Sequence, residues 1–360
     1  MSILVLNLGS TSFKFELFDE RSLESLEKGE FEMPADSAGK DAVKQEEVDK
    51  TFREMLRKIG DVSLIKAVGH RIVHGGDKYL ATTLIDTQEI FELENLNSLA
   101  PLHNPYNLAG IKASNKYIPD TPDYAVFDTT FFVNLPEFAK VYPIPYEYYT
   151  EKNIHKFGFH GISHKYAAEQ AAKKLKMPLD KVNLLTVHLG GGASVTAIAK
   201  GSPIDTSMGL TPLEGLMMMT RSGDVGEGVM LEIFKDVLAQ ETDPQKAIEK
   251  LRLVLNNESG IKGICDHDNY LDLLKAVDYG DSRSQLALDM FIHRIRKYIG
   301  AYMLTLGEVH ALVFTGKIGA GKAVTRKKIC DKIKLLANVE KIVVKPHEEL
   351  AIASEIKNLL

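Results

Sequence analysis

The chain has 360 residues, of which 44% are hydrophobic and 26% are charged, as expected of a globular protein with about two domains. Its 44 basic and 49 acidic residues give a formal net charge of −5, which argues against a general nucleic-acid-binding protein because such proteins need a strongly basic face. The two cysteines, Cys265 and Cys330, are too few for a disulfide framework or a four-cysteine zinc site and favour a reducing compartment. The sequence shows neither a secretory signal nor an apolar run of the ~20 residues that span a bilayer. We therefore expect a cytoplasmic protein that binds neither nucleic acid nor membrane.

The first predicted element is an N-terminal hairpin. Residues 3–8 form an apolar run, residues 9–12 are Gly-Ser-Thr-Ser, and residues 13–18 alternate between apolar and charged side chains, which predicts strand, tight turn and strand. A turn rich in glycine and serine points several backbone N–H groups in one direction and can bind phosphate oxygens. With Lys14 behind it, this turn is a candidate phosphate site. The alternative is an ordinary turn followed by a solvated lysine.

Helical spacing follows at residues 43–59, and residues 65–73 predict a further strand. The strand runs into a glycine turn ending at Gly76 and carries Arg71, whose planar guanidinium suits a carboxylate or a phosphate. A surface salt bridge is the alternative. The segment 100–105, Ala-Pro-Leu-His-Asn-Pro, predicts either a rigid pocket wall or the capped start of a helix.

Asp128 follows the predicted strand 124–127 and therefore lies at a carboxyl end, where ligand sites of α/β proteins gather. A helix N-cap is the alternative. Further on, His160 and His164 stand among glycines, but no glutamate follows the first histidine and no third ligand is evident, so a zinc site is disfavoured. A histidine that donates to a developing phosphoryl charge is the better hypothesis. The stretch 134–149 lacks clean periodicity and is the expected crossing between domains.

A second hairpin of the same kind lies in the second half of the chain. Residues 183–189 predict a buried strand, the three glycines 190–192 a turn, and residues 193–199 the returning strand. His188 stands two residues before the first turn glycine, as Asn7 does 181 residues earlier. The halves share almost no sequence identity, so the pattern predicts a repeated architecture rather than a proven duplication. We expect a bilobal α/β protein with a cleft between the lobes.

Two later segments are also candidates. Residues 205–224 combine small, polar and methionine residues, and Arg221 is a candidate second arginine for the cleft, whereas the methionines are most simply core filler. The predicted strand 311–315 runs into a predicted turn, Gly-Lys-Ile-Gly-Ala-Gly, at 316–321. This nearly matches a P-loop, but Ala323 stands where Ser or Thr should coordinate Mg²⁺, so a P-loop is disfavoured. Helical spacing is also found at residues 286–306 and 348–360.

Taken together, these segments resemble the acetate kinase family, within the superfamily of acetate and sugar kinases, heat-shock chaperones and actin. The matching motifs are long and follow the family's order along the chain. They are Asn7-Leu-Gly-Ser-Thr-Ser-Phe-Lys14, Gly69-His-Arg-Ile-Val-His-Gly-Gly76, Ala100-Pro-Leu-His-Asn-Pro105, Phe127-Asp-Thr129, Gly158-Phe-His-Gly-Ile-Ser-His164, His188-Leu-Gly190, Asp205-Thr-Ser-Met-Gly-Leu-Thr-Pro-Leu-Glu-Gly-Leu216, Thr220-Arg-Ser-Gly223 and Glu348-Glu-Leu-Ala-Ile-Ala353.

The resemblance implies an α/β fold of two actin-like (ribonuclease H-like) lobes with a central interdomain cleft, and a homodimer. One lobe would hold residues 1–140 and 348–360, on the acetate and phosphate side. The other would hold residues 141–347, on the nucleotide side, with the dimer interface. The implied activity is the reversible transfer of the γ-phosphoryl group of ATP to acetate, which gives acetyl phosphate and ADP. Mg²⁺ is the implied metal, and Mn²⁺ could replace it.

The resemblance also implies roles for individual residues. Arg71 would hold the acetate carboxylate and Arg221 the phosphoryl oxygens, while His160 would stabilise the transition state and Asp128 would be the catalytic carboxylate that orients Arg71. Asn7 and Glu348 would organise the metal through water. The acyl pocket would consist of Arg71, Val73, Leu102, Phe159 and Pro212. The nucleotide and its phosphates would contact Ser10, Ser12, Lys14, His188, Leu189, Gly190, Gly191, Gly192, Asp268, Asn269, Tyr270, Lys317, Ile318, Gly319, Ala320 and Gly321.

Departures from the family pattern concentrate on the nucleotide side. Gly191 stands in place of an asparagine, Asp268-Asn-Tyr270 in place of Asp-x-Arg, and Lys317-Ile-Gly-Ala-Gly321 in place of Gly-Ile-Gly-Glu-Asn. These differences leave open another phosphoryl donor, such as pyrophosphate or another nucleotide, and a non-catalytic nucleotide-binding sensor. On the acyl side, Val73 should leave room for a methyl group and little more, so acetate is expected over propionate or butyrate.

Overall fold

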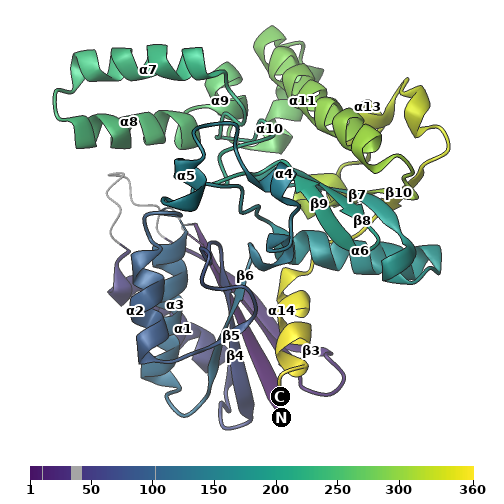
Figure 1. The fold of residues 1–360 in the computed structure, drawn as a ribbon. Helices are drawn as coiled ribbons and strands as arrows, with labels where there is room; N and C mark the ends of the chain where they lie inside the picture. The colour runs from purple at the N-terminus through teal and green to yellow at the C-terminus, as the bar shows by residue number, and fades with distance from the viewer. Residues whose placement is uncertain (10, 34–42, 102) are drawn as a thin grey trace. The chain divides into compact units, whose positions relative to one another are not determined.

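The computed structural model describes residues 1–9, 11–33, 43–101 and 103–360 (Figure 1). These residues divide into two units. The first contains Met1–Val133, Phe159–Tyr166 and His347–Leu360, and the second contains Asn134–Gly158 and Ala167–Pro346. Compared with the expected lobes, residues 134–140 belong to the second unit, and the short segment that carries His160 belongs to the first.

The first unit is built on a six-stranded mixed sheet with the strand order β3-β2-β1-β4-β6-β5. β1, β2 and β3 form an antiparallel meander, whereas β4 runs parallel to both β1 and β6. The predicted N-terminal hairpin is confirmed, with Asn7 opposite Lys14. The strands are β1 (Ser2–Leu8), β2 (Ser12–Asp19), β3 (Ser25–Glu32), β4 (Ile65–Ile72), β5 (Thr83–Ile85) and β6 (Asp123–Phe127).

Helices cover both faces of this sheet (Figure 1). Because neighbouring strand residues point to opposite faces, Leu4 and Leu6 pack with α1 and α3, while Ile3 and Val5 pack with Ile352 on α14. The alternation therefore supplies two apolar surfaces from one strand. The helices of this unit are α1 (Gln45–Ile59), α2 (Thr87–Asn95), α3 (Asn104–Tyr117), the 3₁₀ turn η1 (Thr130–Phe132), the start of α6 (Gly161–Leu175) and α14 (Glu348–Lys357).

The second unit contains a five-stranded sheet with the order β11-β10-β7-β8-β9. Starting from β9, the order is an antiparallel meander (β9, β8, β7) followed by the parallel strands β10 and β11, just as β3, β2 and β1 are followed by β4 and β6. The predicted repeated architecture is thus confirmed. The strands are β7 (Asn183–Leu189), β8 (Ala193–Ala199), β9 (Ser202–Thr206), β10 (Ala311–Thr315) and β11 (Glu340–Val343).

The helices of the second unit differ from the prediction at one place. Residues 316–321, expected to form a turn, form the short helix α12, which begins at Gly316 with a positive φ of 79°. The remaining helices are α4 (Glu137–Lys140), α5 (Glu147–Thr150), most of α6, η2 (Leu179–Lys181), α7 (Glu227–Gln240), α8 (Pro244–Asn257), α9 (Gly260–Cys265), α10 (Tyr270–Asp278), α11 (Ser282–Leu306), α13 (Ala323–Cys330) and η3 (Lys334–Leu336).

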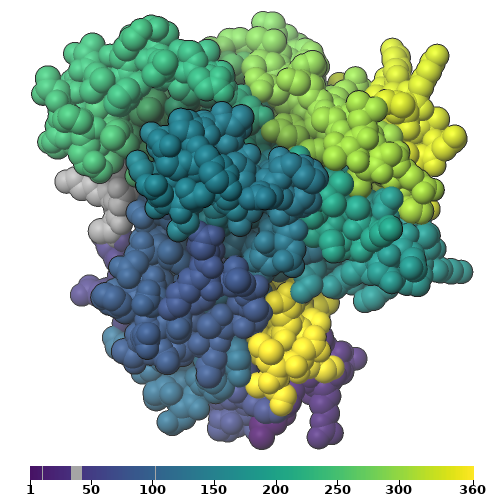
Figure 2. All heavy atoms as spheres, viewed as in Figure 1, coloured from purple at the N-terminus to yellow at the C-terminus, as the bar shows by residue number. Residues whose placement is uncertain are grey.

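α7 and α8 pack against each other as a pair that extends from the second unit (Figures 1 and 2). Only Val237 of α7 is buried, although the helix is rich in apolar residues. The exposed apolar side chains of the pair are Val229, Leu231, Leu238, Ile248 and Leu253. In the part of the chain that the structure describes, no helix has both the length and the apolar character needed to cross a membrane.

Candidate active site

Polar side chains gather at the carboxyl ends of three neighbouring strands in the first unit. Asn7 lies near the end of β1, Arg71 near the end of β4, and Asp128 directly follows β6. Because β1, β4 and β6 are parallel neighbours, these ends share one edge of the sheet, where α/β proteins commonly bind ligands. Asn7 is two residues from Val5 on β1, and Arg71 is four residues from Ala67 on β4, so each shares the face of that apolar residue. Val5 and Ala67 pack on the α14 side. The fold thus directs both polar residues toward the face that α14 covers.

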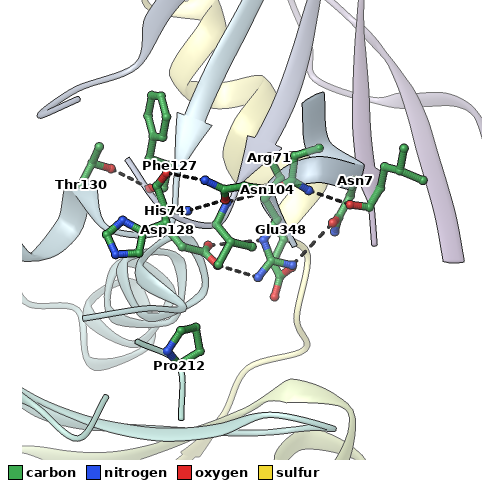
Figure 3. A network of polar contacts seen from close by, with 12 residues as sticks. Asn7, Arg71, His74, Asn104, Phe127, Asp128, Thr130, Pro212 and Glu348 are labelled. Carbon is green, nitrogen blue, oxygen red and sulfur yellow. Dashed lines mark hydrogen bonds and ion pairs between the residues drawn. The ribbon is translucent and has the colours of Figure 1, made fainter. Parts of the chain in front are cut away.

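Arg71 is fixed by carboxylates on two sides (Figure 3). Its Nη2 and Nε donate to Asp128 at 2.7 and 3.4 Å, and its Nη1 donates to Glu348 Oε2 at 2.8 Å and lies 3.5 Å from Asn7 Oδ1. Burial alone would lower the pKa of Arg71, but the charges of Asp128 and Glu348 raise it above its ordinary value. A guanidinium has five N–H groups. Among the described residues, these bonds leave one N–H of Nη2 for a further acceptor.

Asp128 connects Arg71 to the segment that carries His160. Its side chain is 2% exposed. Burial raises its pKa, and the charge of Arg71 together with a hydrogen bond from the backbone of His160 opposes that rise. The backbone N–H of Gly161 donates to the carbonyl oxygen of Asp128 at 2.9 Å. A Cβ at Gly161 would lie 2.1 Å from that oxygen, so only glycine fits. The structure therefore places the backbone of His160 beside Asp128, which contacts Arg71; the catalytic roles of the three residues stay predictions.

His160 itself has a strained backbone. Its φ is +58°, in the left-handed region that costs a residue with a side chain about 1 kcal/mol or more. The contacts at Asp128 and Gly161 hold it there. Strain of this kind, maintained by surrounding hydrogen bonds, is typical of residues that must present a side chain in one direction.

Glutamates at the start of α14 complete the polar cluster. Glu348 contacts Arg71, and Glu349 Oε1 accepts a hydrogen bond of 3.1 Å from Asn7 Nδ2. Three carboxylates and one guanidinium give a formal charge of −3 + 1 = −2 when all are ionised. Hard oxygen donors with excess negative charge fit Mg²⁺, which proteins bind through one or two carboxylates together with phosphates and waters. No group of three or more His, Cys, Asp or Glu among the described residues could enclose a metal by itself.

The loop after β4 is held by two buried amides of α3. Asn107 Oδ1 accepts from the backbone of Val73 at 3.1 Å, and Asn104 both accepts from and donates to the backbone of His74 at 3.1 and 3.0 Å. Asn107 also donates to the carbonyl of Leu8 at 2.7 Å. Since α3 begins at Asn104, the segment 100–105 contains the start of a helix, as one alternative predicted, but no side-chain hydrogen bond caps it; a pocket wall formed by this segment stays a prediction. Asn107 was not predicted as a site residue, because an amide just after the segment 100–105 is by itself no signal of such a role.

The predicted acyl-pocket residues are distributed over both units. Val73 and Phe159 are buried in the first unit, where the Phe159 ring lies 5.2 Å from the ring of His74. Leu102 lies outside the described residues. Pro212 belongs to the second unit. Their assembly into one pocket stays a prediction.

Arg221 and the second glycine turn meet within the second unit. The backbone N–H of Met219, two residues before Arg221, donates to the carbonyl of Gly191 at 3.3 Å. Arg221 Nη1 donates to the carbonyl of Pro212 at 3.3 Å. Burial lowers the pKa of Arg221 to about 10, so the group is still a cation at neutral pH, and an entering anion would stabilise that charge. The convergence of Arg221 with Arg71 stays a prediction.

Other residues predicted to contact the phosphates lie at the two hairpins. Ser12 begins β2, and Lys14 Nζ lies 3.8 Å from Glu30 on β3, whereas Ser10 lies outside the described residues. His188 and Leu189 end β7. The turn that follows, Gly190 to Gly192, is closed by a hydrogen bond of 2.8 Å from the N–H of Gly190 to the carbonyl of Gly192.

Helix α12, with Lys317, Ile318, Gly319, Ala320 and Gly321, lies against the end of β7. A Cβ at Gly316 would be 2.4 Å from the carbonyl oxygen of Leu189, and Arg326 Nη1 caps the helix by donating to Gly319 and Ala320 at 2.7 and 2.9 Å. The tight approach places α12 next to the predicted phosphate turn.

The segment Asp268-Asn-Tyr270 makes contacts that stabilise the fold. The Asn269 side chain accepts from the N–H of Leu271 at 2.8 Å and caps α10. The buried Tyr270 hydroxyl bonds the Thr325 hydroxyl at 2.8 Å. A contact of this segment with a nucleotide stays a prediction.

Comparison with known proteins decides the family. The model of the Acetokinase family matches residues 2–342. The chain belongs to the acetokinase family. It is 45% identical to the acetate kinase of Sulfurovum sp. (strain NBC37-1) over 346 residues, which covers 92% of this chain and 86% of the relative.

Solved structures of acetokinase relatives agree with the fold. The acetate kinase of Porphyromonas gingivalis has a TM-score of 0.84 at 32% identity, with 99% of both chains covered. The propionate kinase of Francisella tularensis subsp. tularensis SCHU S4 has a TM-score of 0.85 at 35% identity, with 98% of both chains covered. The expected actin-like α/β fold, with its repeated sheet topology, is therefore confirmed.

Proposed function

We propose that this protein catalyses the reversible, Mg²⁺-dependent transfer of the γ-phosphoryl group of ATP to acetate, which yields acetyl phosphate and ADP. The observation that carries this proposal is the guanidinium of Arg71, held at the carboxyl edge of the sheet by Asp128 and Glu348 with an N–H left for another acceptor. Membership of the acetokinase family supports the choice of a carboxylate as that acceptor.

In the proposed reaction, an acetate oxygen forms a bond to the γ-phosphorus while the bond from this phosphorus to the bridging oxygen of ADP breaks. Acetate is already ionised at neutral pH, so the protein must position it and neutralise charge rather than remove a proton. Arg71 orients the carboxylate, while His160 and Arg221 stabilise charge on the transferred group. Mg²⁺, when bound, supplies further charge neutralisation; Glu348 and Asn7 would hold it.

The test is acetyl-phosphate formation, trapped as the hydroxamate, with ATP, GTP and pyrophosphate in parallel reactions. We expect product with ATP and none with Arg71→Ala or Arg221→Ala. Faster turnover with pyrophosphate or GTP would show that this compound, and not ATP, is the preferred phosphoryl donor. Nucleotide binding without product from any donor would instead indicate a sensor.

We further propose that acetate is preferred over propionate. The buried Val73 leaves little space for a longer chain, and one methylene changes discrimination by ~1–3 kcal/mol. Because a relative is named a propionate kinase, the two acids must be compared directly. We expect kcat/KM to be at least about tenfold higher with acetate; a higher value with propionate contradicts the preference.

We propose that the protein forms a homodimer through the pair of helices α7 and α8, which carries exposed apolar side chains. Five exposed aliphatic residues on this pair support the assignment, since apolar patches on soluble proteins commonly mark interaction sites. We also propose a cytoplasmic location, in keeping with the free thiols of Cys265 and Cys330.

A further inference from the structure

The start of α14 is attached to three different strands by three consecutive residues. His347 Nε2 lies 2.8 Å from Glu16 Oε2 on β2, Glu348 Oε2 lies 2.8 Å from Arg71 Nη1 on β4, and Glu349 Oε1 lies 3.1 Å from Asn7 Nδ2 on β1. Two of these contacts belong to the polar cluster of the candidate active site. The third, between His347 and Glu16, has no role in the proposed reaction.

The Glu16–His347 contact is directional, and it joins a buried carboxylate to a half-buried imidazole. Glu16 is 4% exposed, and the ring of His347 lies 5.9 Å from the ring of Phe18, two residues further along β2. A buried carboxylate is costly unless a partner meets it with good geometry. The position of His347 is therefore tightly defined, and His347 is bonded directly to Glu348 in the chain.

The rest of α14 is attached mainly by apolar contacts, and near its C-terminal end Glu355 accepts hydrogen bonds from Thr82 and Lys165. Ile352, Ala353 and Ile356 pack against Ile3 and Val5 of β1. Apolar packing is largely non-directional, whereas a hydrogen bond depends on distance and angle. The apolar surface can thus hold the helix on the sheet, but the polar contacts at its first turn define where the carboxylates of Glu348 and Glu349 lie.

We propose that Glu16 and His347 are a positioning pair, which fixes the start of α14 so that Glu348 and Glu349 stand correctly against Arg71 and Asn7. Neither member of the pair touches the reacting atoms. The inference rests on the proposed function for its kinetic consequence, but its structural consequence can be measured independently of activity.

The test compares two variants, one that keeps the hydrogen bond between residues 16 and 347 and one that removes it. Glu16→Gln keeps an acceptor for His347. The double variant Glu16→Gln with His347→Phe keeps a ring beside Phe18 and removes the donor. For each we would measure kcat, KM for acetate, thermal unfolding, and Mn²⁺ affinity in the presence of ADP by electron paramagnetic resonance.

We expect Glu16→Gln to stay within about threefold of the wild type in kcat and Mn²⁺ affinity. The double variant should lose about tenfold in kcat and bind Mn²⁺ at least about threefold more weakly, with KM for acetate changed less than kcat. This split distinguishes positioning from a general loss of folded protein.

A matched control lies on the opposite face of the same sheet. Asp49 on α1 is buried and pairs with Lys116 on α3 at 2.5 Å, so Asp49→Leu with Lys116→Leu removes a comparable ion pair away from α14. This control should alter thermal unfolding and leave kcat and Mn²⁺ affinity unchanged. Equal losses in the control and in the double variant would overturn the proposal.

Two further outcomes are decisive. If the double variant fails to fold, it is replaced by Glu16→Leu with His347→Leu, which leaves no polar side chain at either position. The same results are expected of this replacement. A folded variant of either kind with wild-type kcat and Mn²⁺ affinity would overturn the proposal. If the wild type forms no acetyl phosphate, the proposed function fails, whereas Mn²⁺ affinity still tests the pair.

Discussion

At the scale of single residues, the candidate active site depends on buried charges that stabilise one another. Asp128 and Arg71 are each costly to bury alone, but together they form a two-point contact with Glu348 on the remaining side. Such an arrangement fixes the guanidinium in one orientation, which is what recognition of a small carboxylate requires.

Asp128→Asn should therefore reduce kcat by about 100-fold or more, because the amide cannot accept from Arg71 as a carboxylate does, and the guanidinium loses its orientation. The far-ultraviolet circular dichroism of the variant should match the wild type. Steady-state kinetics by hydroxamate trapping measures the effect. A kcat within threefold of the wild type would show that Asp128 does not orient Arg71.

Arg221→Met should separate activity from stability. Burial disfavours the charged form of Arg221 and lowers its pKa to about 10, so an apolar side chain of similar length should leave the midpoint of thermal unfolding unchanged or raise it. Loss of an arginine that stabilises a transferring phosphoryl group costs about 10³-fold or more in kcat. A strongly lowered midpoint would show that the guanidinium is structural.

Asp49 gives a pH dependence of stability. Burial alone would raise the pKa of Asp49, but hydrogen bonds from Gln45 and Lys116 lower it below its ordinary value. A carboxyl group with a lowered pKa stabilises the fold above its unfolded pKa of about 4, and this contribution is lost as pH falls through the folded value. Asp49→Asn should thus cost about 1–2 kcal/mol at pH 7 in urea unfolding. The difference from the wild type should close near pH 3; a difference of constant size would refute the assignment.

At the scale of elements, α14 is the helix on which the site depends. It packs so closely on β4 that a Cβ at Gly69 would lie 2.3 Å from Ile356 Cδ1 and 2.8 Å from Ile352 Cγ2. The close approach brings the first turn of α14, with Glu348, to the carboxyl edge of the sheet. An apolar contact away from the polar cluster therefore helps to place one carboxylate of the candidate active site.

Gly69→Ala should displace α14 and destabilise the protein by about 1–3 kcal/mol through overpacking, with a lower kcat because Glu348 moves with the helix. Ile356→Val removes the nearer clashing methyl group, so the double variant should recover part of both losses. Denaturant unfolding and kinetics on the three variants measure the effect. Failure of Ile356→Val to restore either quantity would mean that another contact limits the site.

At the scale of the whole molecule, the same strand order is built twice, as β3-β2-β1-β4-β6 and as β9-β8-β7-β10-β11. Each copy begins with a hairpin whose turn contains glycine, and the second carries the α7–α8 pair as an addition. This pair, with its exposed apolar side chains, is the part of the second unit for which we propose a partner, a second copy of the chain.

Leu231→Lys with Leu238→Lys, which lie seven residues apart on one side of α7, should convert a dimer to a monomer, because two charges on each copy would have to be desolvated at the interface. Size-exclusion chromatography with light scattering measures the mass. Lys235→Glu on the same helix, where Lys235 already pairs with Glu232 at the surface, serves as the control and should leave the mass unchanged. A wild type that is monomeric at micromolar concentration would refute the dimer.

The sequence by itself determined much of this protein because the relevant signals are local. Apolar alternation and glycine turns predicted both hairpins, and the position of Asp128 after a strand predicted its place at the sheet edge. The family resemblance then supplied Arg71, His160 and Glu348 as members of one site, and the structure places all of them in one unit.

Only the tertiary structure decided which distant residues support that site. Glu16 and His347 are 331 residues apart, and nothing in the local sequence of either indicates the other. The tertiary structure likewise decided the contacts of Asn107 and Glu349 with β1. It also decided that residues 316–321 form a helix, which packs against β7. Local patterns define which face of an element is apolar, but the contacts of a buried polar group depend on the elements that the whole fold brings beside it.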